Sequence, residues 1–308
     1  MFPLSYLLMV CAAAAAPEER ALAYLAREVP RWSAENHCYS CHHNGDAARA
    51  LYAAARAGRP VPPRALADTS RWLARPADWD HNGGEGEFSD KKLAALQFAA
   101  ALAAAADAGL VKDRDALAKA AERVAGWQER DGRWTVGVGE PIGSPATHGT
   151  ALATYLARQT LRRADARKYR EAVARADAWA RAVPVKTVLD AAAVLRTLGR
   201  DDDAAARAQR RRCLELVRKG QSRDGGWGPY VNSAPEPFDT AVVVLALAAQ
   251  EGNEAAALAR RGRAFLLANQ QEDGSWRETT RPAERESYAQ RLATAGWATL
   301  ALLATAGR

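Results

Sequence analysis

The sequence predicts an all-α protein, a single (α/α)6 toroid of about six helical hairpins. Three observations predict it. The apolar residues are mostly Ala and Leu, a seven-residue pattern recurs along the chain, and two kinds of helical segment alternate. Ala and Leu favour helices, and the scarcity of β-branched and aromatic residues leaves little for strands. With 308 residues, 48% of them hydrophobic, the chain can bury a sizeable core and is too apolar to be disordered.

The N-terminal residues 1–16 predict a signal peptide, because an apolar stretch runs into an Ala tract that offers A-x-A cleavage sites. Pro17 disfavours a cut directly before it, so we expect cleavage after Ala15. Cys11 follows Val10, where a lipoprotein signal has a small residue, and we expect no lipid anchor. No later apolar run reaches the roughly 18 residues that span a bilayer. We therefore expect a periplasmic or secreted protein with no stable membrane span.

The net charge of +7 does not indicate a nucleic-acid partner. The basic residues, mostly Arg, are spread along the predicted helices and are not gathered into one stripe. Solvated helix faces explain them, so we expect no nucleic acid to bind.

The recurring pattern is Q-x-x-D-G-x-W, which occurs at Gln128–Trp134, Gln221–Trp227 and Gln270–Trp276. The first interval is close to twice the second, which predicts stacked units of about 50 residues and a degenerate copy around residue 184. Gly frees the backbone of a turn, Asp bonds turn amides and Trp covers a seam between hairpins. We interpret these segments as structural connectors and assign them no catalytic role.

Between the connectors, amphipathic helices alternate with helices that are apolar nearly all round. An amphipathic helix lies on the outside and an all-apolar one is buried, so the two sets predict an outer and an inner ring. The outer helices are predicted at 18–31, 62–75, 113–128, 167–183, 202–219 and 254–270. The inner helices are predicted at 46–57, 90–108, 147–159, 186–198, 238–250 and 288–304. One toroid then fills residues 17–308.

These repeats, with an inner helix that opens Phe238-Asp239-Thr240-Ala241, resemble the squalene–hopene cyclase and prenyltransferase β-subunit family. The cyclases of that family protonate their substrate from the middle Asp of a D-x-D-D-T-A motif. The resemblance places Phe238 at this position, so we do not expect a working cyclase of that type. Asp239 remains at the last Asp position, and we interpret it chiefly as a helix N-cap. The zinc site of prenyltransferases needs a late Cys, but Cys213 lies inside a predicted outer helix and is expected to be a small buried residue.

Cys38, Cys41 and His42 form a C-x-x-C-H motif, the pattern of c-type haem attachment. Two thiols would form thioethers, and His42 would be the proximal iron ligand. A signal peptide agrees with this, because covalent haem attachment happens outside the cytoplasm. Two alternatives stay open. One is a zinc or other metal site that uses both cysteines with His42, His43, His81 or His148, and the other is a Cys38–Cys41 disulfide or redox pair.

The cysteine motif takes the place of the first connector, and every connector leads into the amino end of an inner helix. We therefore expect the cofactor, the mouth of the ring and His81, His148, Asp46, Asp90 and Asp239 to share one rim. No Met follows Met9, so a distal iron ligand would be His81, His148 or His43, unless the sixth position is open. For His148 the simpler interpretation, a residue at a helix start, is the one that we favour.

An apolar ligand would instead occupy the middle of the ring. The predicted cavity residues are Phe98, Tyr155, Phe238, Asp239 and Trp297. The two function hypotheses are thus a redox protein with one haem at the rim, and a haem-free toroid that binds an isoprenoid-like molecule. A lipid-modifying or carbohydrate-degrading enzyme is a third, for which the sequence offers no catalytic set. The partners expected are a redox partner or a small apolar ligand.

Overall fold

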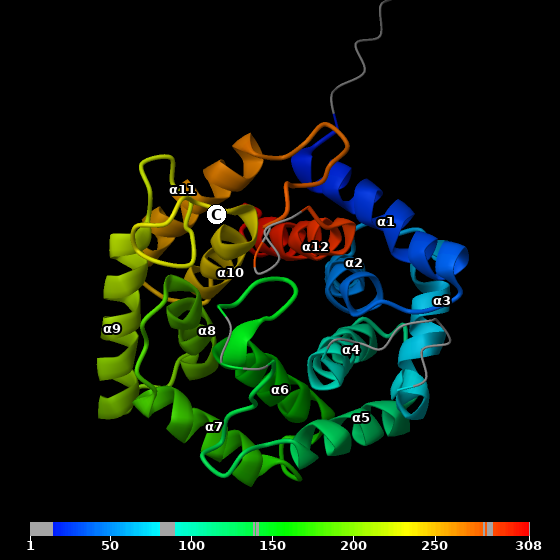
Figure 1. Cartoon of the computed structure of the whole chain (residues 1–308), viewed down its shortest axis with the longest axis horizontal. Helices are drawn as coiled ribbons and strands as arrows, with labels where there is room; N and C mark the ends of the chain where they lie inside the picture. The colour runs from blue at the N-terminus through cyan, green and yellow to red at the C-terminus, as the bar shows by residue number, and fades with distance from the viewer. Residues whose placement is uncertain are drawn as a thin grey trace, which may run out of the picture.

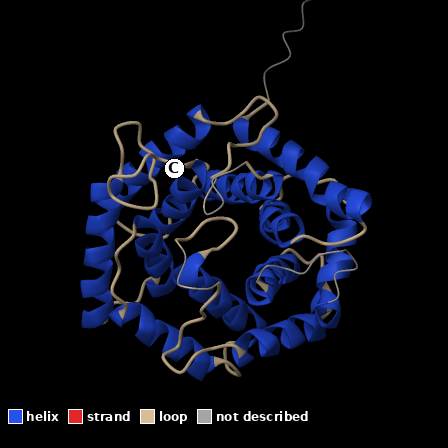
Figure 2. Ribbon diagram, in the orientation of Figure 1, coloured by secondary structure: helices blue, strands red, loops and turns tan. Residues whose placement is uncertain are grey.

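The computed structural model of the chain describes residues 15–80, 90–137, 139, 142–279, 281 and 286–307. Regular structure in these residues is helical, apart from one isolated bridge between Gln270 and Trp276 (Figure 2). The outer helices are α1 (Pro17–Asn36), α3 (Arg64–Leu73), α5 (Arg114–Gly126), α7 (Arg170–Ala182), α9 (Ala204–Gly220) and α11 (Asn253–Ala268). The inner helices are α2 (Ala48–Arg56), α4 (Lys91–Asp107), α6 (Gly149–Asp165), α8 (Val188–Leu198), α10 (Pro237–Leu247) and α12 (Tyr288–Ala304).

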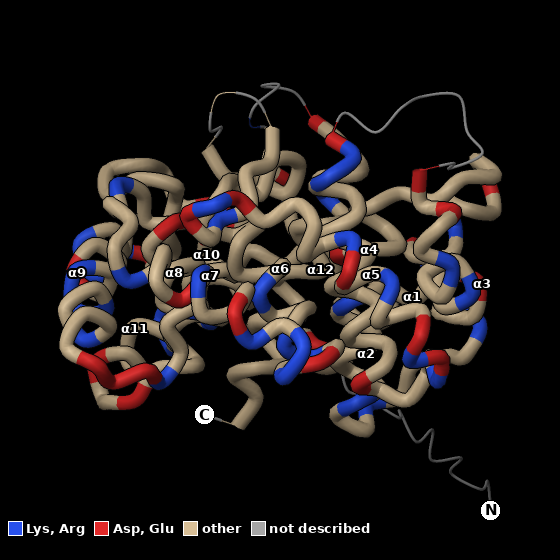
Figure 3. Tube along the Cα trace, turned by 90° about the horizontal axis from the view of Figure 1, so that it is seen from below, with Lys and Arg blue, Asp and Glu red and all other residues tan. Residues whose placement is uncertain are grey.

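Figure 1 shows the two sets as concentric rings, with each inner helix next to its sequence neighbours. Contacts run from α2 through α4, α6, α8 and α10 to α12, and α12 packs back on α2. The predicted (α/α)6 toroid is therefore confirmed. In the Cα trace of Figure 3, Lys and Arg positions alternate with Asp and Glu positions along the outer helices that face the viewer.

The burial of each ring follows from its sequence pattern. In α4 every residue from Leu93 to Ala105 is buried, because the helix has neighbours on all sides. In α9 the buried residues are Ala206, Gln209, Cys213, Val217 and Gly220, spaced three or four apart along one face. Alternation of these two patterns is what sorts the chain into layers.

The connectors tie each outer helix to the next one. The indole nitrogens of Trp134, Trp227 and Trp276 each donate to a backbone carbonyl of the preceding outer helix at 2.7 Å. All three indoles are buried, and their hydrogen bonds leave none of these three donors unpaired. The glutamine of each pattern also donates to a carbonyl at the start of the following outer helix; these acceptors are Ala172, Leu258 and Pro17. The connectors are thus the structural clamps that the sequence predicted.

The third connector closes the ring. Gln270 donates to the Pro17 carbonyl at 2.9 Å, and Gly274 lies so close to Arg20 of α1 that a Cβ there would overlap its backbone carbonyl. Arg263 of α11 forms an ion pair with Glu18 of α1. The first and last outer helices are therefore joined by the same device that joins the others.

The first inner helix, predicted at 46–57, begins earlier in the structure than in the prediction. A π-helical turn, η1 (Cys41–Ala47), runs directly into α2, so that Cys41 is the first helical residue. Ser40 caps this turn, because its Oγ accepts from the His42 amide. Gly45 allows close packing on α4, since a Cβ there would lie 3.0 Å from the Cβ of Gln97. The second half of the cysteine motif is thus part of an inner helix.

Candidate functional site

The cysteine motif lies between α1 and the inner ring, at the place of the first connector. His37 ends α1 with left-handed backbone, at φ 52. Cys38 and Cys41 are half-buried, and neither forms a disulfide in the structure. Burial, with a smaller contribution from the Asp46 charge, raises the pKa of the Cys41 thiol to about 12. The Cys41 thiol is therefore protonated at pH 7, and it stands at the amino-end rim. Cys213, by contrast, is fully buried, as predicted.

The two histidines that follow Cys41 are buried to different degrees. His42 is half-buried, and its Nδ1 atom has no hydrogen-bond partner. His43 is fully buried between the rings of Trp32 and Tyr288, at centroid distances of 4.9 and 5.2 Å, and neither of its nitrogens has a partner. Burial lowers the pKa of His42 to about 4 and that of His43 to about 3. Both imidazoles are neutral at pH 7.

A polar cluster of Asp46, Arg49, Gln97 and His148 occupies the middle of the ring below the motif. The Asp46 Oδ2 atom accepts from Gln97 Nε2 at 2.9 Å and lies 3.0 Å from His148 Nε2. Its Oδ1 atom lies 3.6 Å from Arg49 Nη2. Burial alone would raise the pKa of Asp46, but His148, Arg49 and Gln97 hold it well below its usual range. The cluster is an ionised carboxylate enclosed by donors.

His148 makes its contact with Asp46 from a strained backbone. It stands at the N-cap position of α6 with φ 52, a conformation that residues other than Gly rarely adopt. Its side chain caps no amide and instead reaches Asp46. The helix-start interpretation therefore describes its position but not its contact. Strained residues of this kind are concentrated at functional sites.

The motif and the cluster are electrostatic neighbours. After burial, the charges of Asp46 and His148 contribute most to the pKa of His42. Of the predicted metal ligands, His42 is thus within electrostatic reach of both His148 and its chain neighbour His43, whereas His81 lies outside the described residues. Among the residues that the structure describes, no three His, Cys, Asp or Glu side chains are arranged to hold a metal ion.

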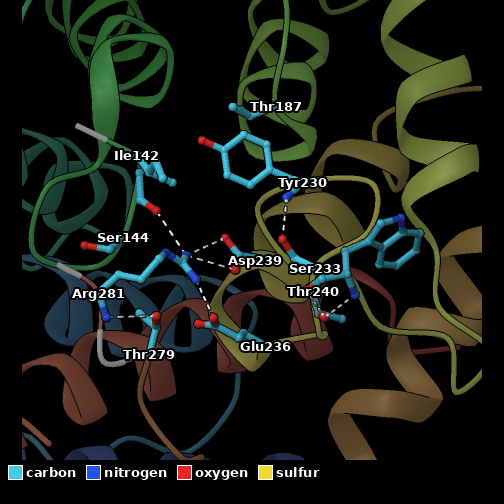
Figure 4. A network of polar contacts seen from close by, with 12 residues as sticks. Ile142, Ser144, Thr187, Tyr230, Ser233, Glu236, Asp239, Thr240, Thr279 and Arg281 are labelled. Atoms are coloured by element: carbon cyan, nitrogen blue, oxygen red, sulfur yellow. Dashed lines mark hydrogen bonds and ion pairs between the residues drawn. The ribbon is translucent and has the colours of Figure 1, made fainter. Parts of the chain in front are cut away.

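Asp239 forms a separate site on the amino side of α10. Glu236 occupies the N-cap position and Pro237 begins the helix, so the N-cap interpretation of Asp239 is wrong. Its buried carboxylate accepts from Arg281 Nη2 at 3.0 and 3.1 Å, and Arg281 also pairs with Glu236 (Figure 4). Burial raises the pKa of Asp239 to about 7, although Arg281 acts in the opposite direction.

A cavity of about 370 Å³ lies in the centre of the ring, on the side of the Asp46 cluster that faces away from the cysteine motif. Its walls come from the carboxyl halves of the inner helices, and its floor contains Trp297 and Arg49, whose guanidinium lies 4.1 Å from the Trp297 ring centroid. Arg56 and Asp107, at the ends of α2 and α4, stand at its mouth. This cavity therefore opens at the end opposite the cysteine motif. We expected the mouth of the ring and the cysteine motif to share one rim, and this cavity does not meet that expectation. The buried side chains of Asp46 and His148 lie between the cavity and the rim formed by the amino ends of the inner helices.

Two of the five predicted cavity residues, Tyr155 and Trp297, line this cavity. Phe98 is buried on the outer side of α4, where it packs on Trp72 and Trp79. Phe238 packs edge-on against Trp297 at 5.9 Å, and Asp239 pairs with Arg281. A helix that is apolar all round does not tell which face is turned to the centre, and this is why the predicted set is divided.

Arginines are the site residues that sequence reasoning missed. Arg49, Arg163 and Arg196 project from inner helices into the cavity, and Gln97 completes the Asp46 cluster. The signal was present in the sequence, since a charge inside an otherwise apolar inner helix must find a partner or a cavity.

Comparisons with known proteins agree with this architecture. Residues 184–308 match the family model of the squalene-hopene cyclase C-terminal domain. The chain has the squalene–hopene cyclase-like toroid fold. No curated protein matches the chain.

Solved structures extend the likeness of the toroid to nearly all of the chain. A variant of the type II terpene cyclase MstE from Scytonema, in complex with geranylgeranyl dihydroxybenzoate, is 15% identical over 94% of this chain and 96% of its own, with a TM-score of 0.57. A protein from Actinoplanes is 16% identical over 94% and 98%, with a TM-score of 0.61. The ent-copalyl diphosphate synthase from Streptomyces platensis is 22% identical over 83% of this chain and 50% of its own, with a TM-score of 0.53. In the described part of the toroid, no helix is both long and apolar enough to cross a membrane.

Proposed function

We propose that this toroid is an exported redox protein that carries one c-type haem at its amino-end rim and does not act as a cyclase of the D-x-D-D type. Cys38 and Cys41 would form the two thioethers, and His42 would be the proximal ligand. The observation that carries the proposal is a C-x-x-C-H motif whose thiols form no disulfide, next to buried imidazole nitrogens that have no partner.

Two features of the residues around the motif support the proposal. A buried nitrogen without a partner costs free energy unless something outside the protein chain binds it, and His42 and His43 together leave three. Both imidazoles are neutral, which is the form that coordinates iron. Among the other described residues, His43 and His148 carry the further imidazoles of the predicted set, and His148 Nδ1 also has no partner. When bound, the haem would supply one-electron transfer.

The fixed geometry of η1 has a role in this proposal. The Ser40 cap and the close packing of Gly45 on α4 hold Cys41 and His42 at the start of a rigid helix. A ligand on a rigid element keeps its orientation when the metal changes charge. Phe238 stands where the cyclases of the family have their proton-donating Asp. This supports the second part of the proposal, that the protein does not act as a cyclase of the D-x-D-D type.

The test is a reduced-minus-oxidised spectrum with a pyridine haemochrome assay, on protein exported from a host that matures c-type cytochromes. We expect a covalent haem band in the wild-type protein and none in the Cys38→Ala/Cys41→Ala variant. Cys213→Ala is the matched control and should keep the band, because Cys213 is buried in α9. Correctly exported wild-type protein without the band would overturn the proposal. Metal analysis of that protein would then test the zinc alternative, which requires zinc that is lost in the double variant.

A second candidate function is favoured by the cavity. A haem-free toroid would hold an isoprenoid-like molecule against its apolar wall, as the related cyclase from Scytonema holds a geranylgeranyl compound. Cavities of this size are typical of small-molecule sites. Farnesol binding, measured by displacement of a fluorescent fatty acid or by calorimetry, tests it. Replacing the small wall residue Ala104 by Trp should abolish that binding, and unchanged binding would contradict it.

A further inference from the structure

One seam of the outer ring lacks a complete connector. Figure 1 shows α7 and α9 side by side on the outer ring, and the two helices are in contact. The chain passes from α7 to the inner helix α8 through the short segment 183–187, at the place where the repeat spacing predicts a degenerate copy. Its residues, Val-Pro-Val-Lys-Thr, include neither the Gly nor the Trp of the other connectors. The seam between α7 and α9 is therefore joined in a different way.

At the three seams with a complete connector, the glycine turn lies on the next outer helix in one manner. A Cβ on Gly132, Gly225 or Gly274 would overlap the backbone carbonyl of an arginine in that helix. The same arginine donates from its guanidinium to the connector; the pairs are Arg175 with Gln128, Arg261 with the Ser222 carbonyl, and Arg20 with Gln270. Each of these turn sites thus combines close backbone contact with an arginine that binds the turn.

The connector glutamine marks the same turn site, because its acceptor carbonyl lies three residues before the arginine. The acceptors are Ala172, Leu258 and Pro17. On α9, Gln209 and Arg212 have this spacing, and they stand as far from the start of their helix as Leu258 and Arg261 do in α11. Both line a groove of about 390 Å³ between α9 and the segment 183–187. The groove therefore lies where a glycine turn binds at the other seams.

The chain itself fills only part of this groove. Gln209 donates from its Nε2 atom to the Val183 carbonyl at 2.7 Å, so the glutamine bond of the clamp is kept but runs in the opposite direction. Arg212 is exposed and donates to Gln209 Oε1 at 2.7 and 2.9 Å, and within the described residues it forms no ion pair with a carboxylate. The arginine that binds the turn at the other seams is left without a turn here.

The charge around the groove favours an acidic occupant. Six basic residues and one acidic residue lie on α9. The acidic residue, Glu215, is itself paired with Arg218 at 2.9 Å and with Lys219 at 3.2 Å. A surface of this kind attracts an acidic segment and repels a basic one.

We infer that the groove between α7 and α9 is a docking site for an acidic glycine turn of a partner protein. The turn would take the place that the chain's own connectors take at the other seams. Glycine would allow close approach to the α9 backbone, and the oxygens of the turn would accept from Arg212. Apolar side chains of the partner would pack on Val183, Val185 and Leu216, which line the groove. The inference does not depend on the proposed function.

A labelled peptide with the sequence of residues 269–276, cyclised head to tail, tests the inference on the full exported chain. This segment contains a glycine turn with Glu272 and Asp273. Cyclisation agrees with the turn, because Gln270 and Trp276 pair across it, and it lowers the ordering cost of binding. We expect saturable binding by fluorescence anisotropy. A dissociation constant weaker than about 0.1 mM would overturn the inference.

Variants of the protein locate the peptide. Arg212→Gln should weaken binding about 10-fold, because it removes a charge-assisted donor from the groove. Arg211→Gln is the matched control, since Arg211 is the exposed neighbour on the same helix and does not line the groove. An equal loss in both variants would show a general attraction to the basic helix, and unchanged binding in Arg212→Gln would place the peptide elsewhere. Either result overturns the inference.

Variants of the peptide test the two features required of the partner. Gly274→Ala in the peptide should weaken binding at least about 10-fold, because the added Cβ would meet the α9 backbone. Glu272→Gln/Asp273→Asn should also weaken it, and more so at low salt than at high salt. Unchanged affinity of the Ala peptide would show that no close backbone contact is made, and unchanged affinity of the neutral peptide would show that charge does not select the occupant. Each of these results would contradict the inference.

Discussion

At the scale of single residues, His43 shows how burial without a partner shapes stability. Its imidazole fills a space between two aromatic rings and has no hydrogen bond. His43→Phe should preserve the ring contacts and remove the unsatisfied nitrogens, so the free energy of unfolding should rise by about 1 to 3 kcal/mol. Denaturant unfolding of the wild-type protein and the variant measures this.

The increase in the free energy of unfolding of His43→Phe over the wild-type protein should depend on pH. The pKa of His43 is about 3 in the folded state and near 6.5 in the unfolded chain, so the unfolded state takes up a proton between these values. The wild-type protein therefore loses stability as pH falls below about 6.5, and the Phe variant lacks that loss. The gain should be about 2 kcal/mol larger at pH 5 than at pH 8. His37→Phe, at an exposed position, is the matched control. The same gain at both pH values for His43→Phe would contradict the expectation.

Arg281 is the second residue whose charge decides stability. Arg281→Met leaves the Asp239 carboxylate buried without its cation, which should cost about 3 kcal/mol at pH 8. The cost should be smaller at pH 5, because burial already raises the pKa of Asp239 to about 7 and the carboxyl can take up a proton. Urea unfolding at the two pH values measures both costs. The double variant Arg281→Met/Asp239→Asn should recover most of the loss at pH 8, and no recovery would show that the pair is not the cause.

At the scale of elements, the connectors act through backbone contact. Gly274 has φ +92 and touches α1, whereas Gly252 has φ +102 and no atom within 4 Å of the point where a Cβ would stand. Gly252→Ala should therefore cost about 1 to 2 kcal/mol from backbone strain alone. Gly274→Ala should cost clearly more, because it adds an overlap with Arg20 and pushes α1 away. Thermal unfolding of the two variants side by side measures the difference, and equal costs would mean that the clamp contributes nothing.

The elements themselves could be predicted well from the sequence. The amphipathic and all-apolar segments assign every outer and inner helix, and α12 has the boundaries predicted for it. The start of the second helix was missed because Ser40 and Asn44 cap a π-helical turn, and wide turns of this kind leave no periodic pattern. At the candidate site, the sequence could not show that Tyr155 faces the cavity and that Phe98 faces the outer ring. Both residues are flanked by apolar neighbours, so no polar face marks which side of the helix is which.

At the scale of the whole molecule, the cysteine motif and the cavity lie at opposite ends of the ring. The layer of Asp46, Gln97 and His148 separates them, and all three side chains are fully buried or nearly so. The burial of this layer could not be predicted from the sequence. The spacing of the motifs places residues at the amino ends of inner helices, but it does not tell whether their side chains fill the centre of the ring. The rim prediction correctly grouped Asp46 with His148, because both stand at the amino ends of inner helices.

We expect the two ends to be independent. Farnesol should bind to the cavity with the same affinity in the wild-type protein and in the Cys38→Ala/Cys41→Ala variant, within about 2-fold, since the buried layer lies between the motif and the cavity. Calorimetry on both proteins measures the coupling. A 10-fold difference would show that the buried layer transmits a change and is not a partition.

The clamp between α11 and α1 also has a consequence for folding. Gln270 and Pro17 are held together across almost the full length of the chain, so their pairing closes a loop that includes most of the protein. Contacts of such long range are costly in chain entropy and form late. Until α11 and α12 have folded, α1 lacks its packing partners on one side. The seam between α11 and α1 is therefore the part of the ring that we expect to close last.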